Sequence, residues 1–341
     1  MATSDARTVI TVAQLGELQS SDAWNACNLA NQTQSAFEYT WIPKALNVNK
    51  TKYTLPNGGF DLTCALGDLS ASKKLPRPLV LLTSLPLSSP EDGNDPDGLV
   101  FCVPVPTPRH DTFIVSTYVW ENVLGRKNLL QSYLIFMMAG LALQIYSRLA
   151  WHEETRGCYF DMCQKTEDFG EAFRTMSGVC AHCETKLAEK IDDRRLRVEQ
   201  VAAARKLFNR AFHKKVCFLA IPFEREIQSV YKMIVKALAQ EEWTMIRADR
   251  VTKPRGSADR ILLSILSSDL ILADLTGNNP NVFYELGWAR ALGLDRILLT
   301  QHQNQLPFDV RDETVVPYVN SDTGRKKLSK DVTLLAGKGA W

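Results

Sequence analysis

The stretch Ile271–Gly293 constrains the fold of this chain most strongly, because its pattern predicts a buried strand, a polar turn and a helix in succession. The apolar run 270–273 is typical of a central strand in a parallel sheet, which is covered on both faces. Asp274 follows at the predicted carboxyl end of that strand, where open α/β sheets bind ligands. The turn at 276–281 is rich in residues that tolerate unusual backbone angles. The stretch therefore predicts a ligand site above the turn.

Predicted strands and helices alternate on both sides of this stretch. Short links between them favour a parallel, doubly wound α/β sheet. No Gly-x-Gly-x-x-Gly follows the first strand, which argues against a dinucleotide-binding redox domain. The sequence also lacks a P-loop and a serine-nucleophile elbow. The predicted strands cover 216–221, 243–248, 296–300 and 315–318, and the predicted helices cover 226–240 and 258–268.

Four pieces of this region occur in the order seen in the nucleoside 2-deoxyribosyltransferase-like family. That family is a flavodoxin-like group related to Toll/interleukin-receptor domains, and the likeness covers roughly 216–318. The resemblance implies a flavodoxin-like sheet and an acid in a Tyr-Glu-Leu-Gly context, which attacks or stabilises C1′ of a ribose while the base leaves. The family includes transferases, nucleotide N-hydrolases and NAD-cleaving immune effectors. The four pieces are Cys217–Phe223, Trp243–Asp249, Ile271–Gly293 and Leu306–Arg311.

Glu285 stands in the Tyr-Glu-Leu-Gly context and is the candidate catalytic acid. An N-glycosidic bond breaks through an oxocarbenium-like state, so a carboxylate near C1′ can form a covalent intermediate or stabilise the cation. The pattern places Glu285 in about the first turn of its helix, near the positive end of the helix dipole. The alternative is an acid that only complements that dipole. Asp274 is the second catalytic candidate, with capping of the turn as its alternative.

The other candidates would surround a nucleotide. Asp274 and Asn281 are placed to hold ribose hydroxyls or to orient Glu285. Phe223 is placed to stack on the leaving base, and Arg247 to bind a phosphate bidentately. Each has a structural alternative in turn formation, core packing or a surface ion pair. The predicted substrate-binding residues are Phe223, Arg247, Asp249, Asn279, Asn281, Tyr284 and Asp309.

Four cysteines, Cys158, Cys163, Cys180 and Cys183, have the spacing C-x₄-C-x₁₆-C-x₂-C. Two close pairs of thiolates can close a tetrahedral structural zinc site. The first residues lack an export signal, which favours metal over disulfides. His152 and His182 can substitute as ligands, although His182, inside the second pair, suits a supporting or exposed position better. The alternative is four unrelated reduced cysteines.

The cysteine frame and the strand–helix order over about 79–187 resemble the archaemetzincin family of zinc proteases. The resemblance implies an α+β zincin-like scaffold with a four-cysteine structural zinc. The chain departs from the family's catalytic His-Glu-x-x-His motif, because Arg156 stands four residues after His152. One histidine cannot hold a catalytic zinc that needs three protein ligands. We therefore expect no proteolysis, and a sensor or docking role for residues 1–183.

The remaining pattern of the first part is less regular. Residues 1–35 are polar and weakly periodic, which indicates a short helix at 12–18 or partial disorder. The apolar run 129–146 approaches the length of a membrane span, but three polar residues interrupt it and favour a buried helix. Strands are predicted at 37–48, 53–69, 79–85, 99–105 and 113–120.

Composition places the chain among ordinary soluble proteins. Of its 341 residues 45% are hydrophobic and 23% charged, and the net charge of +2 gives no case for a nucleic-acid surface. We expect a cytoplasmic protein that does not bind a membrane. Residues 184–215 are predicted to form a charged helical connector before a domain at 216–341, with a partner helix or an oligomer contact as the alternative.

These features support three hypotheses of function. The first is an N-glycosidase effector that cleaves the nicotinamide–ribose bond of NAD⁺ or a related nucleotide, in a regulated context such as antiviral defence. The family likeness then implies a protein or ligand trigger at the first domain and a homo-oligomer. The second is a nucleoside 2-deoxyribosyltransferase or nucleotide N-hydrolase in salvage. The third is a nucleotide-binding signalling module without catalysis.

Overall fold

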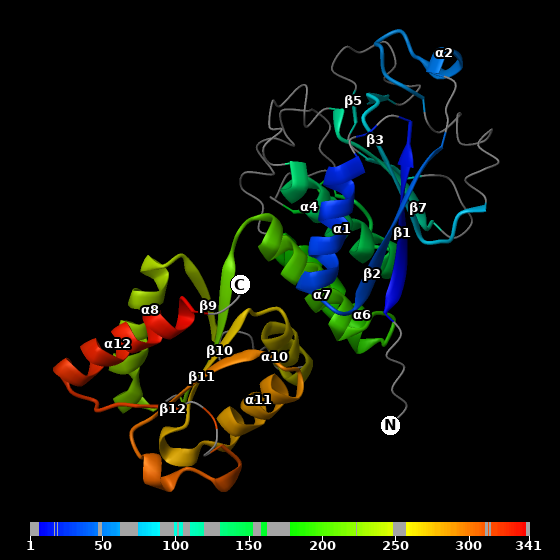
Figure 1. Cartoon of the computed structure of the whole chain (residues 1–341). Helices are drawn as coiled ribbons and strands as arrows, with labels where there is room; N and C mark the ends of the chain where they lie inside the picture. The colour runs from blue at the N-terminus through cyan, green and yellow to red at the C-terminus, as the bar shows by residue number, and fades with distance from the viewer. Residues whose placement is uncertain are drawn as a thin grey trace. The chain divides into compact units, whose positions relative to one another are not determined.

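The computed structural model of the chain divides into two compact units, residues 1–212 and 213–341 (Figure 1). The division lies inside the stretch 184–215, where the sequence predicts a connector. Each unit has its own sheet and its own core, and each is described by itself. The structure describes residues 7–16, 18, 20–46, 50–61, 74–88, 99–100, 102–104, 110–118, 130–152, 158–161, 178–222, 224–247, 257–310, 313 and 315–338.

The first unit is built on a five-stranded sheet in the order β2-β1-β3-β7-β6. The first four strands run parallel, and β6 pairs antiparallel with β7. Helix α1 (Ser20–Thr33) connects the parallel neighbours β1 and β2, as parallel pairing requires. The strands are β1 (Thr8–Leu15), β2 (Phe37–Leu46), β3 (Leu79–Thr83), β6 (Cys102–Pro104) and β7 (Thr112–Ser116), and a separate antiparallel pair joins β4 (Leu87–Ser88) to β5 (Leu99–Val100).

Two predictions for this unit are wrong. Segment 12–18 was expected to be helical or disordered, but Thr8–Leu15 is a strand with neighbours on both sides. Its β-branched and apolar run suits a strand that is covered on both faces. The parallel strands with α1 between them also make the unit α/β rather than α+β. A third prediction, the strand 53–69, is only partly tested. Its first residue, Tyr53, is instead the last residue of the short helix α2 (Lys50–Tyr53), and residues 62–69 lie outside the described part.

Helix α4 (Leu130–Ser147) confirms the prediction of a buried apolar helix, because most of its side chains lie in the core. By length and apolar composition alone it is also the one helix in the described residues that could span a membrane. Its Gly140 carries the ring of Tyr159 so closely that a Cβ would collide with it. The same ring packs against Phe136 of α4, with centroids 5.4 Å apart. The loop around Tyr159 is therefore fixed on α4.

Helices α6 (Ala181–Asp192) and α7 (Val198–Ala211) belong to the first unit. Helix α7 packs on α4, with the rings of Phe208 and Phe136 5.5 Å apart. An ion pair between Arg205 and Glu184 joins α7 to α6. The apolar stripe of the predicted connector is thus the face with which α7 enters the core.

The second unit contains five parallel strands in the order β9-β8-β10-β11-β12, so the predicted parallel sheet is confirmed. Two apolar clusters cover its faces, one with α8 and α12 and the other with α10 and α11. The strands are β8 (Lys215–Ala220), β9 (Trp243–Arg247), β10 (Leu270–Asp274), β11 (Asp295–Thr300) and β12 (Val315–Pro317). The helices are α8 (Gln228–Gln240), α10 (Ser257–Leu266), α11 (Pro280–Ala291) and α12 (Asp322–Ala336), with 3₁₀ turns η4 (Arg225–Ile227), η5 (Thr276–Asn278), η6 (Gln303–Gln305) and η7 (Phe308–Val310).

The strand order changes direction between β8 and β10. From β8 the chain first adds β9 on one side, and then places β10 and its successors on the other. The connections therefore leave β8 and β10 on opposite sides, which makes the carboxyl ends of these two strands the topological switch point of the sheet. Ala220 ends β8 and Asp274 ends β10, so Asp274 lies at this switch point.

Candidate active site and metal centre

Glu285 lies in the second turn of α11. The helix begins at Pro280, and Asn279 caps it by accepting a hydrogen bond of 3.0 Å from the amide of Asn281. The sequence pattern predicts Glu285 in about the first turn of its helix, whereas the structure places it one turn further along. Because the dipole acts within the first turn, it contributes little at Glu285. The interpretation of Glu285 as an acid that only complements the dipole therefore loses its basis.

Glu285 is buried as a residue, since only 6% of it is exposed. Within the described part of the chain, Glu285 makes no hydrogen bond and no ion pair. Burial raises its pKa to about 7. A carboxyl group of this kind exchanges its proton near neutral pH, which is a property that acid–base and nucleophilic sites require.

Asp274 is buried as well, but each of its carboxylate oxygens accepts a hydrogen bond. Oδ1 accepts a hydrogen bond of 3.0 Å from the amide of Thr276, and Oδ2 accepts one of 2.7 Å from Tyr318 Oη. Burial raises the pKa of Asp274, while these two partners oppose the rise. The bond to Thr276 is the turn cap that the sequence offered as the alternative role. The bond to Tyr318 adds a second function, because it fixes the carboxylate at the carboxyl edge of the sheet.

Three residues around Asp274 were missed by sequence reasoning. Gln301 Nε2 donates to Tyr318 Oη at 3.2 Å, and the Gln301 amide donates to Thr276 Oγ1 at 3.1 Å. Each of the three follows closely on a parallel strand: Thr276 on β10, Gln301 on β11 and Tyr318 on β12. Polar residues just after predicted strands are a usable signal, because the carboxyl ends of parallel strands meet at one edge.

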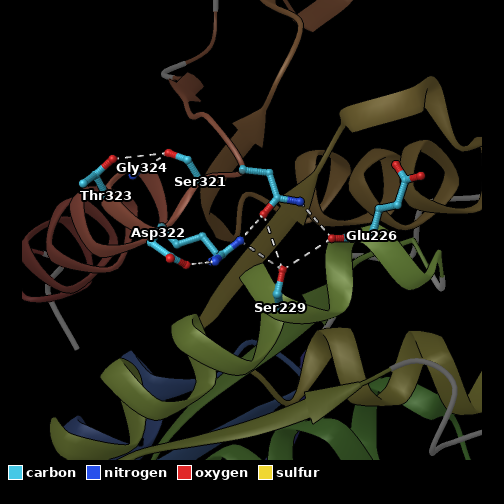
Figure 2. A network of polar contacts seen from close by, with 8 residues as sticks. Glu226, Ser229, Ser321, Asp322, Thr323 and Gly324 are labelled. Atoms are coloured by element: carbon cyan, nitrogen blue, oxygen red, sulfur yellow. Dashed lines mark hydrogen bonds and ion pairs between the residues drawn. The ribbon is translucent and has the colours of Figure 1, made fainter.

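A polar network beyond Tyr318 holds this edge together (Figure 2). Asn320 Nδ2 donates to the carbonyl of Glu226 at 2.9 Å, which connects the chain after β12 to the start of α8. Arg325 of α12 donates to Asn320 Oδ1 at 2.8 Å and pairs with Asp322. The side chain of Glu226 points away from the network in Figure 2. The network therefore anchors the segment that carries Tyr318 to two helices.

The other predicted substrate residues occupy varied positions. Arg247 ends β9, where its guanidinium stacks 4.4 Å above the ring of Tyr231. Its Nη1 also contacts Gln228 Oε1 at 3.5 Å. Such a planar, partly ordered guanidinium suits a phosphate. Phe223, Asp249 and the end of the closing piece, Arg311, lie outside the described residues.

Tyr284 and Asp309 are exposed. Tyr284 is 59% exposed, and its ring lies 4.4 Å from that of Trp288 on the same helix. Asp309 accepts a hydrogen bond of 2.7 Å through its backbone carbonyl from Arg290. The structure thus brings Asp274 together with residues that were not predicted, and it gives Tyr284 and Asp309 surface positions.

The first unit holds a cluster of metal-ligand side chains. Donor atoms of His152, Cys158, Cys180 and Cys183 all lie within 4.8 Å of one another. Three of the four predicted cysteines are therefore brought together, while Cys163 lies outside the described residues. His182 is exposed and is not a member of this group. Soft thiolates and an imidazole in this arrangement fit Zn²⁺.

The local environment shifts the pKa values of the three thiols in this cluster in different directions. Burial raises the pKa of Cys158 above its usual range, and that of Cys183 to about 11. At Cys180 burial also raises the pKa, but hydrogen bonds from the Cys183 amide and neighbouring thiols outweigh it and bring the pKa to about 7. Cys180 is the N-cap of α6, where exposed amides stabilise a thiolate. A cation among these sulfur atoms would balance the charge of the buried thiolates.

Comparison with known proteins gives partial structural likenesses. No family model and no curated protein match the chain. An archaemetzincin from Methanopyrus kandleri is 17% identical, with 56% of this chain and 98% of that chain covered at a TM-score of 0.39. A zinc-dependent peptidase from Methanocorpusculum labreanum is 12% identical, with 52% and 99% covered at a TM-score of 0.39. A CMP N-glycosidase from Clostridium botulinum is 21% identical, with 35% and 98% covered at a TM-score of 0.30.

Proposed function

We propose that the second unit hydrolyses the N-glycosidic bond of a nucleotide, with NAD⁺ as the first substrate to test and Glu285 as the acid at C1′. The observation that carries the proposal is the burial of Glu285 without a hydrogen-bond or ion-pair partner in the described residues. An ionisable group in such a place costs stability, and the described residues offer it no hydrogen bond or ion pair in compensation. A buried acid of this kind is a candidate functional group rather than a structural one.

Cleavage of an N-glycosidic bond needs one carboxylate at C1′, the role proposed for Glu285, and one oriented neighbour, the role proposed for Asp274. The bond between C1′ and the base nitrogen breaks, and its electron pair leaves with the base. The ionised Glu285 either bonds to C1′ or stabilises the cationic ribose, and water then supplies the new hydroxyl group. Nicotinamide leaves NAD⁺ as a neutral molecule, because the pyridinium nitrogen takes up that electron pair. This reaction therefore needs no proton donor for the leaving group, whereas most nucleosides do.

Asp274 and Arg247 complete the proposed site. Asp274 cannot act as a free base, because two donors already engage its carboxylate. Its remaining acceptor capacity suits ribose hydroxyls. Arg247 ends β9 at the same edge of the sheet, where it would bind a nucleotide phosphate. We further propose that the strand order 2-1-3-4-5 makes the unit flavodoxin-like, with the nucleotide at the β8/β10 switch point.

The first unit has a different role in this proposal. Within its described residues a single histidine, His152, belongs to the cluster of metal-ligand atoms, which suits a structural metal and no protease centre. We propose that it senses or docks a trigger and that base release is regulated, as an effector in antiviral defence would be. Assembly of several copies is part of the same proposal.

Base release tests the proposal directly. The full-length protein is incubated with NAD⁺ and with a panel of nucleosides and nucleoside monophosphates that includes CMP. Free base is measured by chromatography for the wild type, for Glu285→Gln and for the control Glu241→Gln. Glu241 is exposed at the far end of α8, so its substitution leaves the edge of Asp274 intact. We expect nicotinamide from the wild type and the control, and a loss of at least about 10³-fold in Glu285→Gln.

The other outcomes separate the alternatives. Base from a nucleoside or nucleotide but not from NAD⁺ would favour salvage chemistry. Equal release by Glu285→Gln and wild type would contradict the role of Glu285. Silence across the panel, with binding of a nucleotide by both proteins in calorimetry, would favour a signalling module. Because an assembly requirement can silence the enzyme, the panel is repeated at high protein concentration.

A further inference from the structure

We propose that the metal centre of the first unit is a zinc site with three cysteines and one histidine, in which His152 is the fourth ligand and Asp161 positions its ring. The cysteine spacing alone predicts four thiolates. The structure places His152 among Cys158, Cys180 and Cys183, and Cys163 lies outside the described residues. This inference concerns the first unit and is independent of the proposed base release in the second.

The first support is the distance between donor atoms. His152 Nε2 lies 3.7 Å from Cys180 Sγ. In a tetrahedral zinc site with Zn–S and Zn–N bonds of about 2.3 and 2.05 Å, sulfur and nitrogen ligands are separated by about 3.6 Å. The imidazole nitrogen is therefore already one ligand distance from a thiol. The same distance also fits a thiol–imidazole hydrogen bond, and the position of Asp161 and the path of the backbone favour the metal.

The second support is the position of Asp161. Its Oδ1 lies 3.2 Å from His152 Nδ1, at ion-pair distance from the ring nitrogen that does not contact Cys180. Its Oδ2 accepts a hydrogen bond of 2.8 Å from the amide of Cys158. A carboxylate this close to Nδ1 favours a proton on that nitrogen, and so the tautomer whose Nε2 carries the lone pair. Metal-binding histidines are typically oriented in this way.

The third support is the path of the backbone. His152 and Asp161 form a parallel bridge, and the His152 amide donates to the carbonyl of Phe160 at 2.9 Å. His152 therefore lies beside Phe160 and Asp161, which brings it close to Cys158. The Phe160 amide also contacts Cys158 Sγ at 3.4 Å. One short segment thus holds a thiol, an imidazole and the carboxylate that orients the imidazole.

Charge favours the same ligand set. Three thiolates and a neutral imidazole around Zn²⁺ carry a net charge of −1, whereas four thiolates carry −2. Cys158 and Cys183 are buried, at 0% and 3% exposure. Because burial of net charge raises the free energy of the folded protein, the site with one histidine is favoured over the site with four thiolates at this buried position.

X-ray absorption on the wild type provides the primary test, because it needs no variant that can fail to fold. The full-length zinc protein is measured at the zinc edge. We expect three sulfur scatterers at about 2.3 Å and one nitrogen at about 2.0–2.1 Å. A shell of four sulfur atoms without nitrogen would overturn the proposal, as would a purified protein that binds no zinc from zinc-supplemented buffer.

Variants then identify the ligands. Zinc content and the thiolate-to-cobalt absorption of the Co²⁺-substituted protein are compared for His152→Ala, Asp161→Asn, Cys163→Ser and the matched control His182→Ala. We expect Cys163→Ser and His182→Ala to keep one metal and the wild-type absorption. Asp161→Asn should lower zinc affinity by about 10–100-fold, and His152→Ala by more. Loss of metal in Cys163→Ser, together with wild-type affinity in His152→Ala, would contradict the assignment.

Discussion

At the scale of single residues, the two buried acids of the second unit show how differently a fold can treat one functional group. Asp274 receives a hydrogen bond on each oxygen, and these bonds limit the rise of its pKa. Glu285 receives none from the described residues, and burial alone raises its pKa to about 7. Asp274 is therefore held in one orientation, whereas Glu285 retains the capacity to act on a ligand. The fold tolerates a destabilised acid at this position, which is common at functional sites.

Burial of the ionised Glu285 should lower the free energy of unfolding. Glu285→Gln should therefore make the protein more stable, by an amount that depends on pH. The pKa is about 4.5 in the unfolded chain and about 7 in the folded one. Since the folded value is the higher, the penalty is absent below pH 4.5, grows through the interval and is complete above pH 7. The substitution should therefore add up to about 3 kcal/mol at pH 8 and little at pH 4.5. Hydrogen exchange of peptides from residues 213–341 at both pH values measures this difference, and an equal effect at both would contradict it.

At the scale of secondary-structure elements, two helical glycines have opposite surroundings. Gly140 in α4 faces the ring of Tyr159, and a Cβ there would collide with it. That ring is buried between α4 and Phe208 of α7, so it has little freedom to move. Gly287 in α11 has no atom within 4 Å of a Cβ in the described structure. One glycine is therefore needed for packing, and the other is not.

A Gly→Ala substitution should therefore lower stability at position 140 and raise it at position 287. Gly140→Ala should destabilise the first unit by about 1–3 kcal/mol through overpacking. Gly287→Ala should stabilise the second unit by about 0.5–1 kcal/mol, because alanine favours the helix. Thermal unfolding of the full-length variants measures both effects. A neutral Gly140→Ala would show that Tyr159 can leave its position, which would weaken the argument that the loop of Cys158 is fixed on α4.

At the scale of the whole molecule, two units with separate cores share one chain. The metal-ligand cluster joins the segment at His152 and Cys158 to the start of α6, and all of these lie in residues 1–212. The residues around Asp274 lie in residues 213–341. Binding of a metal should therefore contribute directly to the stability of the first unit, since a ligand of the folded state stabilises that state alone.

Chelation should separate the two units in calorimetry. Removal of zinc from the full-length protein should lower the unfolding temperature of the first unit by at least about 5 °C and leave that of the second unchanged. Hydrogen exchange assigns each transition to its residues, and readdition of zinc is the control. A single transition that moves as a whole after chelation would show that the two units unfold together, contrary to this prediction.

The sequence by itself determined the features that depend on local pattern. The run 270–273 gave a buried parallel strand, the pattern after it gave a helix, which the structure begins at Pro280 inside the predicted turn, and the apolar stretch 129–146 gave a buried helix. The cysteine spacing indicated a metal cluster, of which three members are seen together. These features could be predicted because hydrophobic periodicity, caps and short spacings act over a few residues.

The tertiary structure alone decided which distant groups meet. Tyr318 bonds to Asp274 across 44 positions, and His152 reaches Cys180 across 28. The interior place of Thr8–Leu15 in its sheet depends likewise on pairing with Leu79–Thr83, far along the chain. Strand order and register fix such pairs, and no local periodicity encodes them. The chain's own pattern thus supplied the elements and the candidate acid, whereas folding supplied the partners that fix Asp274, buried Glu285 without a hydrogen bond from the described residues and brought an imidazole to the thiols.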